Sequence, residues 1–344
     1  MRNGKAIGVV LFQLGGPDRL EAIEPFLYNL FSDPDIIQFP FSKLARRPLA
    51  RLIASRRAKK VADHYAAIGG SSPIGELTSR QARALEAELR KVLDAKVFVA
   101  MRYWHPLTEE TIQEIAKESF DQLILLPLYP QYSQVTTGSS LNEWTRKYRA
   151  AGLNHAQVKV IRQFYDHPGY IEALVANINA TLARFPAPGD VTIVFSAHGV
   201  PESVIEGGDP YKDQLEATVR FVTSCGGWPN PHRLCYQSRV GPGRWLRPSL
   251  DATMRELAGQ GVKKLLVVPI AFVTDHVETL HEIDVEAREV AGGLGFAQFE
   301  MMPALNDSTR FIQALADLVK GAVGLEPPTR EGALLAGEGR ALRS

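Results

Sequence analysis

The feature that most limits the possible folds of this chain is a series of short, unbroken apolar runs. They occur at residues 6–14, 123–128, 191–195 and 265–273, and helical patterns lie between them. A run without polar alternation is typical of a β-strand that is buried on both faces. Strands that alternate with helices predict a parallel sheet covered by helices, so we expect an α/β fold.

The length of 344 residues favours two domains. We expect a first domain over residues 1–160 and a second over residues 161–307. The helix predicted at 308–324 is expected to pack back on the first domain, and residues 325–344 are expected to form a flexible tail. Both halves show the strand–helix alternation, but their sequences contain no matched repeat.

Charge and composition exclude several other classes of protein. The formal net charge is +1, which gives no reason to expect nucleic acid binding. The longest apolar runs fall far short of the roughly 18 residues that indicate a transmembrane helix. The two cysteines, Cys225 and Cys235, are too few for a four-thiolate metal site.

Polar and aromatic residues gather where the predicted strands end. Arg102 and Tyr103 follow one strand, Ser133 lies shortly after the next, and His198 follows the strand at 191–195. Ligands of parallel α/β sheets bind beyond the carboxyl ends of the strands. We therefore expect these residues to meet in one site, although each of them alone is compatible with a structural role.

The last apolar run leads into an acidic segment. Glu278, Glu282 and Glu286 are spaced four residues apart and would form one stripe of carboxylates on a helix. Together with Asp275 and His276, this stripe suggests the handling of cations or protons. An exposed helix with an acidic surface explains the same pattern equally well.

His198 and Glu278 are candidates for holding a metal ion. Neutral imidazole accepts protons and binds borderline metals, and we expect a carboxylate such as Glu278 to face His198 from another strand end. Two protein ligands hold a divalent ion loosely, whereas structural sites usually use four. This arrangement favours a metal that is transferred over one that is permanently bound.

Basic and apolar residues interleave over residues 36–57 and slightly beyond. Between Lys43 and Lys60 there are eight lysines and arginines and no acidic residue. The pattern is typical of an interfacial helix or of a lip that receives an apolar anion, but a solvated helix packed on one side fits it too. Pro40 and Pro48 are expected to break the segment into short pieces.

Several motifs run through the chain. They are LGGPD (14–18), NLFSDPDII (29–37), IGGSSPI (68–74), MRYWHPLTEE (101–110), LPLYPQYSQVTTGSSLNEW (126–144), FSAHGVPESVIEGGDPY (195–211), CYQSRVGPGRWLRPS (235–249) and PIAFVTDHVETLHEID (269–284). In this order, and over nearly the whole chain, they resemble the ferrochelatase family, whose members insert ferrous iron into a porphyrin. The SAHG…GDPY and DHVETL segments together are highly specific.

The resemblance implies a role for each matching position. His198 matches the histidine of the SxHG motif, implicated in pyrrole deprotonation and metal binding, and Glu278 matches its partner carboxylate across the pocket. The positions that match a polar path for iron or protons are Asp275, His276, Glu282 and Glu286. The positions that match the porphyrin pocket and its lip are Leu14, Arg56, Arg57, Tyr65, Arg102, Tyr103, Ser133 and Trp245. Leu14 stands where some relatives carry Met.

The resemblance also implies two Rossmann-like domains, each a parallel sheet flanked by helices, with the active-site cleft between them. The activity it implies is insertion of Fe2+ into protoporphyrin IX to form protohaem, the terminal step of haem biosynthesis. Two alternatives stay open. One is a chelatase acting on coproporphyrin or another tetrapyrrole, and the other is a porphyrin or haem carrier without catalysis.

Fe2+ is then a substrate, and no permanently bound cofactor is expected. The C-terminal tail contains no cysteine, so we expect no iron–sulfur cluster, which needs about four thiolate ligands. The expected partners are porphyrin and ferrous iron, without nucleic acid. We expect a cytoplasmic monomer, with peripheral contact of residues 36–57 with the inner face of the cell membrane as a further option.

Overall fold

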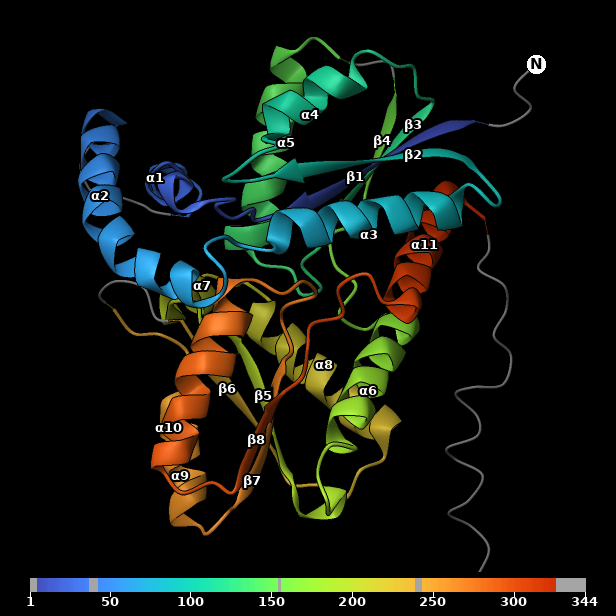
Figure 1. The fold of residues 1–344 in the computed structure, drawn as a ribbon. Helices are drawn as coiled ribbons and strands as arrows, with labels where there is room; N and C mark the ends of the chain where they lie inside the picture. Colours follow the sequence, from blue (N-terminus) through green and yellow to red (C-terminus); the bar gives the residue numbers. More distant parts are fainter. Residues whose placement is uncertain (1–4, 37–42, 154–155, 239–242, 326–344) are drawn as a thin grey trace, which may run out of the picture.

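The computed structural model describes residues 5–36, 43–153, 156–238 and 243–325 of the chain. Two four-stranded parallel sheets, each flanked by helices, form the molecule (Figure 1). The predicted α/β architecture is therefore confirmed.

The first sheet has the strand order β2–β1–β3–β4, and all neighbouring pairs are parallel. Its strands are β1 (Ala6–Gln13), β2 (Asp94–Met101), β3 (Gln122–Pro127) and β4 (Gln157–Val160). Along β1, Val9 and Leu11 belong to one apolar core while Val10 and Phe12 belong to another. Because both faces are buried, polar residues do not interrupt the apolar run.

The second sheet has the order β6–β5–β7–β8 and is also parallel. Its strands are β5 (Thr192–His198), β6 (His232–Gln237), β7 (Lys264–Pro269) and β8 (Gln298–Met301). His198 ends β5 and lies opposite Gln237, the last residue of β6. Residues that follow these strands therefore meet at one edge of the sheet.

Helices cover both sheets (Figure 1). The α-helices are α1 (Ile23–Ser32), α2 (Lys43–Ala67), α3 (Ile74–Leu89), α4 (Thr108–Ile115), α5 (Ser139–Ala150), α6 (Pro168–Leu182), α7 (Glu202–Glu206), α8 (Tyr211–Gly226), α9 (Leu250–Gly259), α10 (Arg288–Gly293) and α11 (Thr309–Val323). The shorter or wider helices are the 3-10 turns η1 (Leu20–Ala22) and η3 (Pro188–Asp190) and the π-helices η2 (Gln134–Gly138) and η4 (Glu278–Ala287).

One apolar core joins the two halves of the molecule. It contains Leu11 and Leu126 from the first sheet, Phe195 and Leu266 from the second, and residues of α3, α6, α8 and α11. The helix α11 packs against both α6 and α3, so this helix bridges the halves (Figure 1). The two sheets are thereby held in a fixed relation to each other.

The predicted fragmentation of the basic segment is wrong at Pro48. Pro48 lies inside α2, a continuous helix of 25 residues. It is the sixth residue of the helix, so only the bonding of the first turns is affected and the remaining turns propagate undisturbed. Pro40 lies outside the described residues, as does nearly all of the tail predicted at 325–344.

Within the described part of the chain, no helix has both the length and the apolar content needed to cross a bilayer.

Candidate active site

His198 stands at the carboxyl end of β5 with its side chain one-third exposed. The backbone at this point is held firmly, because Tyr211 Oη donates a hydrogen bond to the His198 carbonyl oxygen at 3.0 Å and Gly199 N donates to the Gln237 carbonyl oxygen at 2.8 Å. The backbone that carries the imidazole is therefore fixed, while part of the ring stays accessible to solvent.

Glu278 is the first residue of the π-helix η4, and its carboxylate contacts His198 directly. The distance from His198 Nδ1 to Glu278 Oε2 is 2.7 Å. Glu278 was predicted to face His198 from the end of another strand, and the structure agrees: Glu278 follows β7, His198 ends β5, and both belong to the second half of the chain. The loop after β7 brings Glu278 back over the end of β5.

The charge state of this pair follows from its surroundings. Burial disfavours the charged form of both groups, but the pKa of Glu278 is lowered because His198, His276 and Ser238 stabilise the carboxylate. Burial likewise opposes the imidazolium, yet the carboxylates of Glu278 and Glu282 raise the net pKa of His198. An ionised carboxylate cannot donate, so His198 Nδ1–H donates to Glu278, and in the neutral form of the imidazole Nε2 carries the accessible lone pair.

Ser238 extends the pair towards a second carboxylate. Its hydroxyl contacts Glu278 Oε2 at 3.0 Å and also makes a short contact with Glu282 Oε2. One hydroxyl proton cannot serve two ionised carboxylates. Burial, followed by the charge of Glu278, raises the pKa of Glu282 to about 7. At neutral pH, Glu282 therefore holds a proton for part of the time and can pass it along this chain of groups.

His276 and Asp275 lie behind the pair and differ in their surroundings. His276 is buried, its Nδ1 donates to the Thr274 carbonyl oxygen at 3.0 Å, and its Nε2 is 3.9 Å from Glu278 Oε1. The Asp275 carboxylate instead accepts hydrogen bonds from Asn306 Nδ2, Thr279 Oγ1 and Ala304 N. His276 thus belongs to the polar cluster, whereas Asp275 braces the loop that carries it.

Glu286 lies one turn beyond Glu282 and has different neighbours. Its carboxylate is half exposed and is closest to the rings of His64 and His281. The three carboxylates predicted as one stripe do follow one side of η4, but they serve two separate groups of histidines. A π-helix, with its i→i+5 hydrogen bonds, keeps residues four apart on nearly the same side.

The first half of the chain contributes a mostly apolar cluster. Leu14 follows β1 and packs beside the buried Tyr65 and Tyr103. Burial raises the pKa of the Tyr65 phenol, and the nearby charges of Glu278 and Glu282 raise it further. Tyr65 is thus a predicted pocket residue of the first half whose phenol is influenced by carboxylates of the second half.

Arg102 does not present a free charge. Its Nη2 lies 2.9 Å from Asp33 Oδ2, and Asp33 is completely buried. The same carboxylate oxygen accepts hydrogen bonds from Tyr103 Oη and Ser139 Oγ, each at 2.6 Å. Arg102, which was expected in the porphyrin pocket, therefore has no free charge to offer a ligand carboxylate, because the internal carboxylate of Asp33 already occupies its guanidinium.

Ser133 is also a scaffold residue in this structure. It is fully buried, and its hydroxyl donates to Asp209 Oδ2 at 3.0 Å. Asp209 accepts from Gln134 N as well, at 2.7 Å. This carboxylate ties the loop after β3 to the loop before α8, and so connects the two halves of the chain.

Trp245 lines a cavity of about 860 Å³ beside η4. Ser238, Glu282 and Glu286 line the same cavity. The Trp245 Nε1 is buried without a hydrogen-bond partner among the described residues. Arg56 and Arg57 do not line this cavity. Both are exposed on α2, and the Arg57 guanidinium lies 5.5 Å from the centre of the Phe31 ring.

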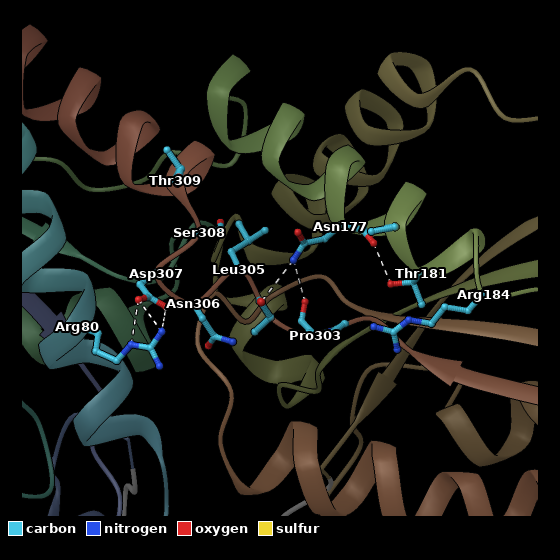
Figure 2. Close-up of a pocket in the computed structure, with 12 residues that line it drawn as sticks. Arg80, Asn177, Thr181, Arg184, Pro303, Leu305, Asn306, Asp307, Ser308 and Thr309 are labelled. Carbon is cyan, nitrogen blue, oxygen red and sulfur yellow. Dashed lines mark hydrogen bonds and ion pairs between the residues drawn. The ribbon is translucent and has the colours of Figure 1, made fainter.

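A second cavity of about 470 Å³ lies among α3, α6 and the start of α11 (Figure 2). Arg80 of α3 pairs with Asp307 through two hydrogen bonds, at 2.9 and 2.8 Å. None of the predicted site residues lines this cavity. The ion pair of Arg80 and Asp307 joins the halves, and we assign this cavity a structural role.

Sequence reasoning missed Asp33, Ser139, Asp209 and Ser238. Ser238 follows the end of β6 and has a positive φ of 60°, so its place at a strand end was a usable signal. Asp33 and Asp209 lie within the quoted motifs NLFSDPDII and FSAHGVPESVIEGGDPY, but the motifs gave no sign of their partners, which lie far away in sequence.

Comparison with known proteins agrees with this site. A family model described as Ferrochelatase matches residues 6–323. The chain is 49% identical over 317 residues to the ferrochelatase of Aquifex aeolicus, covering 92% of this chain and 99% of that protein. It is 48% identical over 328 residues to the ferrochelatase of Thermosynechococcus vestitus, covering 94% of this chain and 84% of that protein.

Solved structures with a similar fold include SirB from Bacillus subtilis with Fe3+, with a TM-score of 0.55 and 10% identity over 92% of this chain and 96% of that one. Another is DR2241 from Deinococcus radiodurans, described as similar to chelatases, with a TM-score of 0.51 and 14% identity over 94% of this chain and 56% of that one. At these identities the likeness concerns the fold alone.

Proposed function

The chain belongs to the ferrochelatase family, and we propose that it inserts Fe2+ into protoporphyrin IX at the edge of the second sheet. The contact of 2.7 Å between His198 Nδ1 and Glu278 Oε2 carries this proposal. It fixes the imidazole in the tautomer whose Nε2 is a free base, and it sets an anion where the resulting imidazolium needs one.

The chemistry requires a proton acceptor. Two N–H protons leave the centre of the porphyrin as the metal enters. In our proposal His198 Nε2 accepts a proton, and Glu278 stabilises the positive charge that forms on the ring. Ser238 and Glu282 then provide an outlet, since the pKa of Glu282 is raised to about 7 and suits proton exchange near neutral pH.

The first half of the molecule supports protoporphyrin as the substrate. Tyr65 and Leu14 offer apolar surface, and the charge of Arg102 is neutralised by Asp33. The exposed Arg56 and Arg57 of α2 remain for carboxylate groups at the periphery of the ring. A pocket of this kind suits a porphyrin with few carboxylates better than the more carboxylated coproporphyrin.

The test is anaerobic incubation of the purified protein with Fe2+ or Zn2+ and either porphyrin, followed by absorbance. We expect metalloporphyrin to form with multiple turnovers, faster with protoporphyrin. Faster turnover of coproporphyrin would refute protoporphyrin as the preferred substrate. Tight retention of porphyrin without turnover would favour a carrier.

The variant Glu278→Gln should slow metal insertion about 10- to 100-fold while changing porphyrin affinity much less. Glutamine can still accept from His198 Nδ1 but carries no charge, so the pKa of His198 falls and the base weakens. The acidic limb of kcat/KM should move to lower pH, because an imidazole with a lower pKa loses its proton at a lower pH. Zinc insertion rates across pH and porphyrin fluorescence quenching measure the two effects.

Asp284→Asn provides a matched control for this variant. Asp284 lies on the same π-helix but is exposed and pairs with Arg288. It should insert metal at the wild-type rate. Equal losses of porphyrin affinity and insertion rate in Glu278→Gln would contradict the assigned role.

We propose that no resident cofactor or iron–sulfur cluster takes part. Burial raises the pKa of the Cys235 thiol to about 12, which disfavours the thiolate that a cluster would need. Cys225 is exposed on α8. Iron analysis of the protein purified without added metal should find no cluster absorbance, and its presence would overturn this proposal.

We further propose that α2 rests on the inner face of the cell membrane, where an apolar porphyrin would arrive. Leu49, Leu52 and Arg56 follow the spacing i, i+3, i+7 and form one helix face. The two leucines are 37% and 47% exposed. Apolar and cationic groups on one face favour contact with anionic lipid. Of the wider segment expected to make this contact, residues 37–42 lie outside the described residues.

The double variant Leu49→Gln/Leu52→Gln should bind vesicles with anionic lipid at least about 10-fold more weakly, since each lost leucine contact removes part of its roughly 2 kcal/mol of burial energy. Vesicle co-sedimentation measures this. Val92→Gln, which changes another exposed apolar residue, should bind normally. If the wild-type protein does not co-sediment with vesicles that contain anionic lipid, the proposed membrane contact is wrong.

A further inference from the structure

A buried glutamine on α3 makes hydrogen bonds to the part of the molecule that carries His276 and Glu278. Gln81 is fully buried. Its Nε2 donates to Thr274 Oγ1 at 3.0 Å and to the Asn306 carbonyl oxygen at 2.9 Å. These two bonds use both protons of the amide nitrogen. The Gln81 Oε1 lies 3.2 Å from the same Thr274 hydroxyl, so the amide is engaged at both ends.

The amphipathic pattern of α3 does not require a polar residue at this position. The buried face of the helix is largely apolar, and Ala82 and Leu85 belong to the core that joins the halves. Taking an amide out of water costs stability unless hydrogen bonds replace its contacts with water. The hydrogen bonds of the Gln81 amide reach residues of the second half of the chain. The use of this side chain therefore lies in the segment that it holds.

That segment is the loop between β7 and η4. The Thr274 carbonyl oxygen accepts a hydrogen bond from His276 Nδ1 at 3.0 Å, and Glu278 follows shortly after as the first residue of η4. Gln13, at the end of β1, also approaches the Thr274 hydroxyl, with its Nε2 at 3.4 Å. The first half of the molecule thus reaches this loop at one hydroxyl, close in sequence to the His276 and Glu278 side chains.

Asn306 braces the loop from its other side. Its Oδ1 accepts from Asp275 N at 3.0 Å, and its Nδ2 donates to the Asp275 carboxylate at 2.7 Å. Figure 2 shows Asn306 beside Asp307, which pairs with Arg80, the neighbour of Gln81 in α3. The Arg80 side chain is half exposed, so its ion pair constrains the loop weakly. The buried bonds of Gln81 are the stronger link between α3 and this corner.

We infer that Gln81 is a positioning residue for metal insertion. Through Thr274 it holds the loop so that the Glu278 carboxylate meets His198 Nδ1 at 2.7 Å. A displacement of about 1 Å at a reacting group can cost about 100-fold in rate, even when its cause is far from the chemistry. The inference rests on the proposed function, because it gives Gln81 a part in the same reaction.

The position of Gln81 separates its effect on rate from porphyrin binding. Tyr65 and Leu14, the pocket residues of the first half, belong to a different apolar cluster from the buried residues of α3. Gln81 instead connects the first half to the loop that ends at Glu278. Loss of its hydrogen bonds should therefore disturb the His198–Glu278 pair and leave the apolar wall of the pocket in place.

The first test is Gln81→Met, which keeps the length of the side chain and removes the amide. In the zinc insertion assay, kcat and kcat/KM for the porphyrin should fall together by about 10- to 100-fold, with KM unchanged. Thr274→Val removes the hydroxyl partner and should cause a similar loss. The double variant should lose less than the product of the two single losses, because both residues act through one hydrogen-bonded unit.

Thr78→Val is the matched control. Thr78 lies one turn earlier on α3 and is fully buried, but its hydroxyl has no hydrogen-bond partner in the part of the chain that the structure describes. This variant should insert metal at the wild-type rate. Far-UV circular dichroism gives the folded fraction of each variant. A wild-type kcat in Gln81→Met, or a loss that only follows the folded fraction, would overturn the inference.

A crystal structure of Gln81→Met distinguishes this inference from the proposed function. The distance from His198 Nδ1 to Glu278 Oε2 should exceed the usual 2.7–3.2 Å of a hydrogen bond. An unchanged contact would overturn the role of Gln81, whether or not the wild-type protein inserts metal. Failure of the wild-type protein to insert metal would instead refute the proposed function, and the contact in the variant would still decide whether Gln81 positions Glu278.

Discussion

The variant His198→Ala is expected to lower kcat for metal insertion by at least about 10³-fold. A positioned general base contributes typically 10²–10⁴ to a rate, and here Glu278 makes the imidazole a stronger base than burial alone would allow. In the alanine variant the Glu278 carboxylate also loses its partner, the His198 imidazole. Zinc insertion under anaerobic conditions, followed by absorbance, measures the loss.

The same variant should still fold. The His198 side chain is one-third exposed and belongs to none of the apolar cores. His232→Ala is the matched control: it removes an exposed imidazole from the opposite end of the same sheet, at the start of β6. That variant should retain full activity. Wild-type turnover in His198→Ala would refute the role of the imidazole as the base.

The variant Asp33→Asn is expected to destabilise the protein by about 3–5 kcal/mol. Asp33 is completely buried and neutralises Arg102, whose side chain is only 10% exposed. Breaking such a pair leaves a buried guanidinium without a counter-charge, and that cost is of this size. The hydroxyls of Tyr103 and Ser139 lose a charged acceptor as well. Urea denaturation followed by circular dichroism measures the free energy of unfolding.

Asp35→Asn is the matched control, two residues along the chain. Asp35 pairs with Arg146 at 2.8 Å, but the arginine is 46% exposed, so the loss should stay below about 1 kcal/mol. The double variant Asp33→Asn/Arg102→Met should be more stable than Asp33→Asn alone, because it removes the uncompensated charge. A small effect of Asp33→Asn would show that water reaches Arg102.

Much of the architecture was predictable because it depends on local pattern. Unbroken apolar runs such as that in β1 are typical of strands that are buried on both faces, and the structure places strands of two parallel sheets in these runs. The placement of His198 at a strand end follows from the same reasoning. The motif order also indicated the family, which the comparisons confirm.

Local pattern was less reliable where two effects compete. A proline normally interrupts a helix, yet α2 continues through Pro48 because it lies near the start, where few hydrogen bonds are lost. The acidic stripe was compatible with an ordinary exposed helix. The structure makes it a π-helix whose first carboxylate is largely buried against His198.

The sequence by itself determined the sheets and the residues that end them, because periodicity along the chain records which faces are buried. Only the tertiary structure decided which charges meet. Asp33 lies 70 residues from Tyr103, Ser133 lies 76 from Asp209, and His198 lies 80 from Glu278. A charged side chain carries no mark of its partner, and its pKa and role are set by whichever groups the folded chain brings within a few ångströms.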